Sequence, residues 1–275
     1  MSAAVARGYL FVPGNRPERF DKACAAGADA VIVDLEDAVP ADGKEAARTA
    51  LAKWLAPGHP VFIRINGAGT PWFEDDLALC GQPGVAGIVL PKAERAEDIA
   101  RLELAGAKTV LPLVESALGF ANARVLADAG PVQRLLFGSI DFRLDLGIED
   151  EEGEDEDALL MFRSQLVLVS RLAGLQPPVD GVSTAIDDAE ALRRAARRAR
   201  ALGFGGKLCI HPKQLAPVRD CFRPSPAELA WANRILEASA ASGGAAVSVD
   251  GRMVDRPVME RAQRIVDDAR QQGNR

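Results

Sequence analysis

Eight short apolar segments recur along the chain, and their spacing restricts the fold more than any other feature of the sequence. Six of the seven intervals between their starts are about 22 to 31 residues, which suits a strand, a helix and two short loops. The segments are Gly8–Val12, Ala30–Asp34, Val61–Ile65, Gly87–Pro91, Val110–Val114, Arg134–Gly138, Val179–Val182 and Lys207–Ile210. Eight units of this kind predict an α/β protein built as a parallel (β/α)8 TIM barrel.

The segments between the predicted strands carry helix start and stop signals. Residues 17–27 have a proline near the start and a glycine at the end. Residues 70–81 begin with Thr70, a predicted cap, and continue with acids that suit the positive end of a helix. Residues 187–203 begin acidic, end basic and stop at Gly203. The arginines of this last helix are interpreted as a solvated face.

The chain continues well beyond the eighth predicted strand, further than one closing helix requires. Residues 225–244 predict a helix followed by a flexible joint, the small-residue stretch 238–244. Residues 246–272 predict a small hairpin and a last helix. We therefore predict a barrel catalytic domain over residues 1–223 and a C-terminal helical extension over residues 224–275.

Composition restricts the chemistry that a site in this chain can use. The two histidines are too few for a histidine-rich zinc or copper site, so a bound metal should be oxygen-ligated Mg²⁺, or else Mn²⁺. The four cysteines form no CxxC pair, which is typical of reduced thiols in a cytoplasmic protein. No apolar run approaches the ~20 residues that span a bilayer, and we expect no signal peptide and no membrane partner.

The net charge of −6 comes from one part of the chain. Residues 149–157 contain eight acids and no base, whereas the rest of the chain is close to neutral. We interpret the acidic run as a solvated lid over the long sixth interval. A nearly neutral body can accept anionic ligands at local basic clusters, and we expect no nucleic-acid partner.

Charged and polar side chains follow most of the predicted strands directly. In a (β/α)8 barrel, catalytic groups lie at the C-terminal ends of the strands, so these side chains should meet at one mouth. Any one of them can be structural, but their convergence predicts a functional site. In strand order they are Arg16, then Asp34, Glu36 and Asp37, then Arg64 and Asn66, then Lys92, Glu115, Asp141 and finally His211.

The residue types at these strand ends suit metal-assisted chemistry. Glu115 and Asp141 follow the neighbouring fifth and sixth strands and can offer carboxylate oxygens to a divalent ion, with water and substrate completing its ligands. Glu36 and Asp37 can hold metal-bound waters beside a base such as Arg16 or Lys44.

The basic strand-end residues suit an anionic substrate. Arg64 interrupts an apolar strand, and a buried guanidinium needs anionic partners. It can also face an oxygen that gains negative charge during a reaction. Arg16 lies in a glycine turn before a predicted helix, which is a weak signal for an anion contact.

Seven motifs occur in order from about residue 8 to residue 270. They are "LFVPGNRPERFDKACAAGADAVIVDLEDAVP", "VFIRING", "GIVLPKAE", "LPLVESALGF", "FGSIDFRLDLG", "GFGGKLCIHPKQL" and "DGRMVDRPV". As a set they resemble the citrate lyase β-subunit-like group of the HpcH/HpaI aldolase superfamily, which includes malyl-CoA and citramalyl-CoA lyases. The resemblance implies a (β/α)8 barrel, commonly trimeric, with Mg²⁺ and reversible carbon–carbon cleavage of acyl thioesters.

The resemblance also implies roles for individual residues. Glu115 and Asp141 match the metal ligands of the family, and Arg64 matches an arginine near the thioester carbonyl. Arg16 matches a loop that meets the substrate near the metal. Asp255, in "GRMVDRP", matches an acid/base on a C-terminal segment that reaches a neighbouring subunit. The extension is therefore expected to reach the next subunit of a homo-oligomer, a trimer or a multiple of it.

Together these observations predict a Mg²⁺-dependent carbon–carbon lyase. It would cleave a 3-hydroxy-3-carboxyacyl thioester, of malyl-CoA, citramalyl-CoA or citryl type, into a 2-oxo acid and an acyl thioester such as acetyl-CoA. The predicted catalytic residues are Arg64, Asp255, Glu36 and Asp37; the substrate-binding residues are Arg16, Arg64 and Lys92; the metal ligands are Glu115 and Asp141. Two alternatives are a metal-dependent aldolase on free 2-oxo acids without CoA, for which Lys92 leaves Schiff-base chemistry open, and a β-like subunit of a larger lyase complex.

Overall fold

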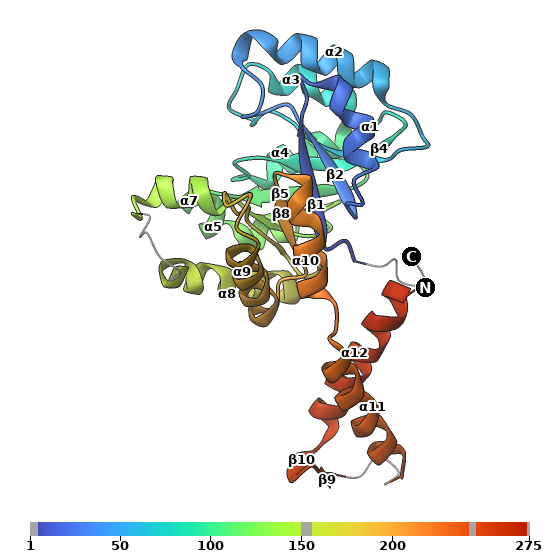
Figure 1. Ribbon diagram of the computed structural model, residues 1–275. Helices are drawn as coiled ribbons and strands as arrows, with labels where there is room; N and C mark the ends of the chain where they lie inside the picture. The colour runs from blue at the N-terminus through green and yellow to red at the C-terminus, as the bar shows by residue number, and fades with distance from the viewer. Residues whose placement is uncertain (1–4, 150–155, 242–245, 274–275) are drawn as a thin grey trace. The chain divides into compact units, whose positions relative to one another are not determined.

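Eight parallel strands close into a barrel in the computed structural model, which describes residues 5–149, 156–241 and 246–273 (Figure 1). Each strand pairs with the next in sequence, and β1 also pairs with β8, which closes the ring. The strands are β1 (Gly8–Pro13), β2 (Ala30–Asp34), β3 (Val61–Arg64), β4 (Val85–Leu90), β5 (Val110–Val114), β6 (Leu136–Phe137), β7 (Val179–Asp180) and β8 (Gly206–Cys209). The predicted (β/α)8 TIM barrel is confirmed.

Helices connect these strands. They are α1 (Phe20–Cys24), α2 (Lys44–Trp54), α3 (Phe73–Asp76), α4 (Ala96–Leu104), α5 (Ala117–Ala121), α6 (Ala123–Ala127), α7 (Ser139–Leu146), α8 (Leu160–Leu172), α9 (Ala189–Leu202) and α10 (Leu215–Phe222). Helix α9 begins at the cap Asp188 and ends before Gly203, whose φ of 101° suits glycine. The predicted cap at Thr70 is wrong, because α3 begins only at Phe73 and the Thr70 hydroxyl donates to the Gly67 carbonyl.

The strands are apolar on both faces because both faces are covered. One face of each strand points into the barrel and the other packs under helices, so a parallel barrel strand is a continuous apolar run. All five residues of β5 are buried. Branched and aromatic side chains fill the barrel interior, among them Tyr9, Ile32, Leu113 and Leu208.

Arg134, just before β6, is fully buried below this interior layer. Its guanidinium donates to the carbonyl oxygens of Ala6 and Pro177, at 2.8 and 2.9 Å, and to the Tyr9 hydroxyl at 3.2 Å. These oxygens satisfy its N–H groups, although burial lowers the pKa of Arg134. The strand predicted over Arg134–Gly138 is shorter in the structure. Only Leu136–Phe137 form β6, and Arg134 lies just before it.

The chain forms two compact units, Val5–Arg219 and one that contains Asp220–Arg275. The second unit contains α11 (Pro226–Ala241), a hairpin of β9 (Val247–Val249) and β10 (Arg252–Val254), and α12 (Arg256–Gly273). Asp250 and Gly251 form the two-residue hairpin loop, both with positive φ, as such turns require. Apolar side chains from both helices and β10 pack together, including Ile235, Val254 and Val266. The flexible joint predicted over 238–244 is wrong for residues 238–241, which continue α11, and residues 242–244 lie outside the described residues.

The acidic run over 149–157, interpreted as a solvated lid, also lies largely outside the described residues. No helix in the part of the chain that the structure describes is long and apolar enough to cross a membrane.

Asp180, at the end of β7, holds two buried cations between the barrel and its helices. Its carboxylate accepts from Arg163 of α8 at 2.9 Å and from Lys207 of β8 at 3.0 Å, and all three side chains are at most 2% exposed. Burial alone would raise the pKa of Asp180, but Lys207 and Arg163 outweigh it and lower the pKa to about 2. This ion pair joins α8 to two adjacent strands.

Replacing Asp180 with Asn should lower the free energy of unfolding by roughly 3–5 kcal/mol near neutral pH, because two buried cations lose their carboxylate. The folded pKa of Asp180 lies below the ordinary value of 3.8, so its contribution is complete above that value and is lost as the pH falls through about 2. Urea unfolding at a series of pH values should show the gap between wild type and Asp180→Asn shrinking over that window. A gap of constant size would contradict this assignment.

Candidate active site

The C-terminal ends of the strands define one end of the barrel, called here the barrel mouth, where most of the predicted site residues lie. Asp34 ends β2 and Glu36 follows it, Arg64 ends β3, Lys92 follows β4 and Glu115 follows β5. Four of these, Asp34, Glu36, Arg64 and Lys92, are joined by ion pairs and are called here the mouth cluster. The expected convergence of charged strand ends is therefore present.

Arg64 is held by a two-pronged contact with Asp34. Its Nε donates to Asp34 Oδ1 at 2.8 Å and its Nη2 donates to Asp34 Oδ2 at 2.6 Å. The Phe11 ring lies 4.9 Å from the guanidinium carbon, which favours the cation further. Burial disfavours the charged guanidinium, but the charges of Asp34, Glu36 and Glu115 outweigh it and raise the pKa of Arg64. Arg64 is a permanent, oriented cation.

The sequence pattern places Asp34 at a strand end but predicts no role for it. In the structure Asp34 is 2% exposed and accepts from both Nε and Nη2 of Arg64. The signal that identifies it is the register of the barrel, in which Asp34 lies directly beside Arg64 on the adjacent strand. Its Oδ1 also accepts from the Glu36 backbone N–H at 2.9 Å, which fixes the turn that follows β2.

Glu36 lies between the two cations of the mouth cluster. Its Oε2 is 2.9 Å from Arg64 Nη1 and its Oε1 accepts from Lys92 Nζ at 2.6 Å. Burial raises the pKa of Glu36 even though both cations oppose that rise. The sequence predicted Arg16 or Lys44 as its basic partner, and this was wrong because Lys44 Nζ donates instead to the carbonyl oxygens of Leu35 and Glu36.

Glu115 is 3% exposed and forms no ion pair within the described residues. Its Oε1 accepts from the Lys92 backbone N–H at 2.7 Å. Burial, with the nearby negative charges of Glu36 and Asp141, raises the pKa of Glu115 to about 8. A buried acid among like charges is stabilised in its ionised form by an added cation.

Asp141 lies in the first turn of α7, which begins at Ser139 directly after β6. Helix N-termini favour carboxylates, and this turn places Asp141 on the same cavity of about 60 Å³ as Glu115, Arg64 and Phe11. The described residues contain no group of three or more metal-binding side chains. Glu115 and Asp141 therefore fit an oxygen-seeking divalent ion that takes its other ligands from water and substrate.

Other predicted residues lie outside this cluster. Arg16 is half exposed and pairs with the exposed Glu18 at 2.7 Å. The Asp37 carboxylate is 59% exposed and lies 3.8 Å from Arg64 Nη1, at the edge of the cluster. His211 accepts a hydrogen bond from the Lys213 N–H through Nδ1 and caps a short turn, which is a structural role. Asp255 lies in the second compact unit, where its Oδ1 accepts from the Val258 N–H at 3.4 Å.

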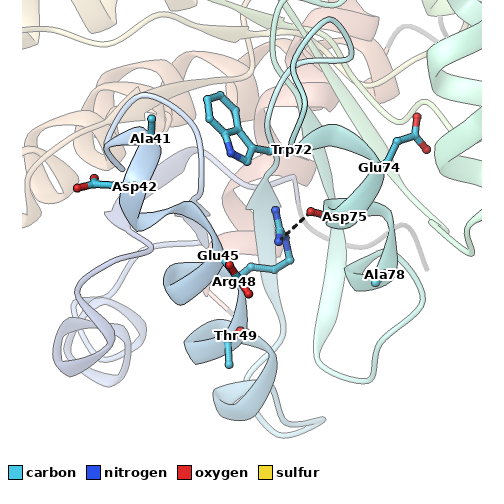
Figure 2. A pocket seen from close by; sticks show the side chains of 9 residues that line it. All are labelled: Ala41, Asp42, Glu45, Arg48, Thr49, Trp72, Glu74, Asp75 and Ala78. Carbon is cyan, nitrogen blue, oxygen red and sulfur yellow. Dashed lines mark ion pairs between the residues drawn. The ribbon is translucent and has the colours of Figure 1, made fainter.

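A larger cavity of about 810 Å³ lies between α2 and α3, on a different part of the first unit (Figure 2). Four of its nine lining residues are acidic, and Figure 2 shows Arg48 reaching toward Asp75, which lies 3.5 Å away. Arg48 Nε also donates to the buried Asp76, whose other oxygen accepts from Asn66. Asn66, expected at the mouth, therefore anchors α3 to β3. Arg64, Glu115 and Asp141 line the small cavity and not this larger one.

Comparison with known proteins assigns a family to this fold and site. Residues 7–212 match the HpcH/HpaI aldolase/citrate lyase family. A citrate lyase subunit beta-like protein of Deinococcus radiodurans is 39% identical, with 96% of this chain and 97% of the relative covered. The mitochondrial citramalyl-CoA lyase of Rattus norvegicus is 32% identical, with 94% and 85% covered. The crystal structure of CitE from Mycobacterium tuberculosis in complex with magnesium, acetoacetate and coenzyme A is 40% identical, with a TM-score of 0.86 and 97% and 98% covered.

The chain belongs to the HpcH/HpaI aldolase/citrate lyase family, as its motifs predicted, and it is a lyase of the citrate lyase β-like type. The matched range contains every predicted site residue except Asp255. The similarity to the CitE structure extends over nearly the whole chain, so it includes the extension as well as the barrel.

Gly138, directly after β6, makes room for Glu115. A Cβ at this position would lie 2.5 Å from Glu115 Cβ, so Gly138→Ala should displace the Glu115 carboxylate. We expect Mn²⁺ affinity, measured by calorimetry or by electron paramagnetic resonance, to fall roughly 10–100-fold, as for loss of a residue that orients a ligand. Gly58→Ala is the matched control, because a Cβ there meets nothing within 4 Å. Unchanged affinity in Gly138→Ala would remove Glu115 from the metal site.

Proposed function

We propose that the chain is a Mg²⁺-dependent carbon–carbon lyase that cleaves a 3-hydroxy-3-carboxyacyl thioester into a 2-oxo acid and an acyl thioester such as acetyl-CoA. One observation carries this proposal. Glu115 and Asp141, which form no ion pair among the described residues, line the same cavity as Arg64, a cation oriented by Asp34. Coenzyme A and magnesium in the CitE complex, and the name of the citramalyl-CoA lyase, support this choice of substrate class and metal.

Glu115 and Asp141 would hold the metal ion. Bound Mg²⁺ supplies Lewis acidity toward oxygens of the substrate. Glu36 and Asp37 flank Arg64 on the β2 loop and would order the water around the site. Arg16 and Lys92, both about half exposed, are the proposed contacts for the anionic groups of the substrate.

The proposed reaction breaks the bond between the hydroxyl-bearing carbon and the carbon next to the thioester. The hydroxyl oxygen loses its proton and becomes the keto oxygen of the 2-oxo acid, while the electron pair of the broken bond forms a thioester enolate. Arg64 would stabilise the enolate oxygen, since donors aimed at developing charge lower the barrier. Asp255 from a neighbouring subunit would act as the acid/base that protonates the enolate carbon. The proton that leaves the hydroxyl would pass to solvent water, and one proton from solvent would return to Asp255, so the reaction consumes and releases no net proton.

This role for Asp255 requires that the C-terminal extension, residues 224–275, reach a neighbouring chain in a homotrimer or a multiple of it. We also propose a cytoplasmic location, on the composition described above. Arg64, Glu115 and Asp141 all lie on one unit, whereas Asp255 belongs to the other. Under this proposal each active site is completed by two chains.

A panel of malyl-CoA, β-methylmalyl-CoA and citramalyl-CoA tests the proposed function, with the 2-oxo acid and the free thiol measured separately. We expect Mg²⁺-dependent release of 2-oxo acid from at least one thioester without matching release of free thiol. Glu115→Gln and Asp141→Asn keep the shape of the side chains and should abolish the activity. Release of free thiol alone would indicate hydrolysis, and activity only on free 2-oxo acids and aldehydes would indicate an aldolase; either would overturn the proposal.

A subunit-mixing experiment tests the composite site. Asp255→Ala and Glu115→Ala chains should each be inactive alone, because each lacks one group in every site. After subunit exchange, some sites combine an intact Asp255 with an intact Glu115, so part of the activity should return. Exchange is verified by native mass spectrometry of isotope-labelled chains. Mixed oligomers that stay inactive would mean that Asp255 does not serve a neighbouring site.

A further inference from the structure

Lys92 has a backbone conformation that side-chain-bearing residues avoid. Its φ is 46°, in the left-handed region, where Cβ crowds the following carbonyl oxygen. Among the described residues with a side chain, only Asp250 shares a positive φ, and Asp250 lies in a hairpin turn that requires it. Lys92 also lies in a turn, together with Pro91 directly after β4, but a positive φ in a turn usually falls on glycine or asparagine, not on lysine. Strained residues of this kind persist where the surrounding structure fixes them, often at functional sites.

The left-handed backbone of Lys92 allows one residue to reach two carboxylates. Its backbone N–H donates to Glu115 Oε1 at 2.7 Å, and its Nζ donates to Glu36 Oε1 at 2.6 Å. Glu115 follows β5 and Glu36 follows β2, so Lys92 links acids from opposite sides of its own strand. The neighbouring Ala93 N–H donates to the Leu113 carbonyl at 3.2 Å, which holds the turn against β5.

We propose that Lys92 is a positioning residue, and that its strained backbone is kept because it aims the amide at Glu115 and the ammonium at Glu36 together. This inference rests on the proposed function for its consequence in catalysis, although not for the strain itself. Glycine would adopt the turn without strain but would lose the ammonium. An extended residue would avoid the strain, but with its amide still on Glu115 it would turn its side chain away from Glu36. A lysine in the left-handed region meets both requirements.

The consequence extends to Arg64. Glu36 carries Lys92 on one oxygen and Arg64 on the other, so loss of the ammonium frees one side of the carboxylate that faces Arg64. Lys92 therefore acts through Glu36 on the orientation of Arg64, in addition to any contact that its exposed half makes with substrate. Its removal should lower kcat more than it raises KM.

Comparison of Lys92→Gly with Lys92→Ala tests the strain, because both lose the ammonium and only alanine keeps a Cβ. Lys92→Gly should melt above Lys92→Ala by roughly 2 °C or more, as expected for relief of left-handed strain in a chain of this size. Lys108, an exposed lysine without positive φ, gives the matched pair. There glycine should melt below alanine, since glycine gains freedom in the unfolded chain. If the glycine variant also melted below the alanine variant at position 92, the claim that Lys92 is strained would be overturned.

Metal binding and kinetics test the positioning. Lys92→Gly keeps the amide that faces Glu115, so its Mn²⁺ affinity should stay within about threefold of wild type, while kcat falls roughly 10–100-fold with a small change in KM. Lys92→Arg keeps a cation near Glu36 and should recover part of kcat. A kcat that stays at the wild-type value in Lys92→Gly, whether or not KM rises, would overturn the positioning role. If the wild-type protein cleaves no thioester, the proposed function fails. The melting temperatures of Lys92→Gly and Lys92→Ala would still show whether the Lys92 backbone is strained.

Discussion

The two-pronged contact between Asp34 and Arg64 is the interaction on which the barrel mouth depends. The parallel register of β2 and β3 places the two residues side by side, and both are largely buried. A buried guanidinium without a partner costs several kcal/mol, so Arg64 is tolerated in an apolar strand only because Asp34 meets it edge to edge. The same aspartate fixes the turn that brings Glu36 to Arg64. The Asp34–Arg64 pair therefore both stabilises the strand ends and orients the residues of the mouth cluster.

Negative charge exceeds positive charge around this pair. Asp34 and Glu36 are balanced by Arg64 and Lys92, but Glu115 and Asp141 form no ion pair among the described residues. Burial, followed by the negative charges of Glu36 and Asp141, raises the pKa of Glu115. A divalent ion would restore balance and would lie close to Arg64, the group proposed to face the enolate oxygen. The site therefore combines a metal that would act on one part of a substrate with a fixed cation for the other.

Sequence periodicity predicted the elements well because barrel strands are apolar runs of regular spacing. The observed bounds of β2 and β5 equal the predicted ones. Strand β6 is shorter than predicted, and Arg134, just before it, is a buried residue whose guanidinium donates to the Pro177 carbonyl. The strand-end pattern predicted which acids and bases lie at the barrel mouth, but it did not predict which of them form ion pairs with one another. The Asp34–Arg64 contact depends on the register between strands far apart in sequence. Space at Gly138 and the backbone of Lys92 have no local signal, because both follow from tertiary packing.

A double-mutant cycle on Asp34 and Arg64 tests the central claim most directly. If Asp34 acts by holding Arg64 in place, removing Asp34 matters little once the planar guanidinium is gone. Turnover of the best thioester substrate is measured for Asp34→Asn, Arg64→Lys and the double variant, with circular dichroism to verify folding. The account predicts that each single change lowers kcat by roughly 10²-fold or more and that the double variant is little worse than Arg64→Lys. Losses that multiply in the double variant would show that the two residues act independently, and would contradict the account.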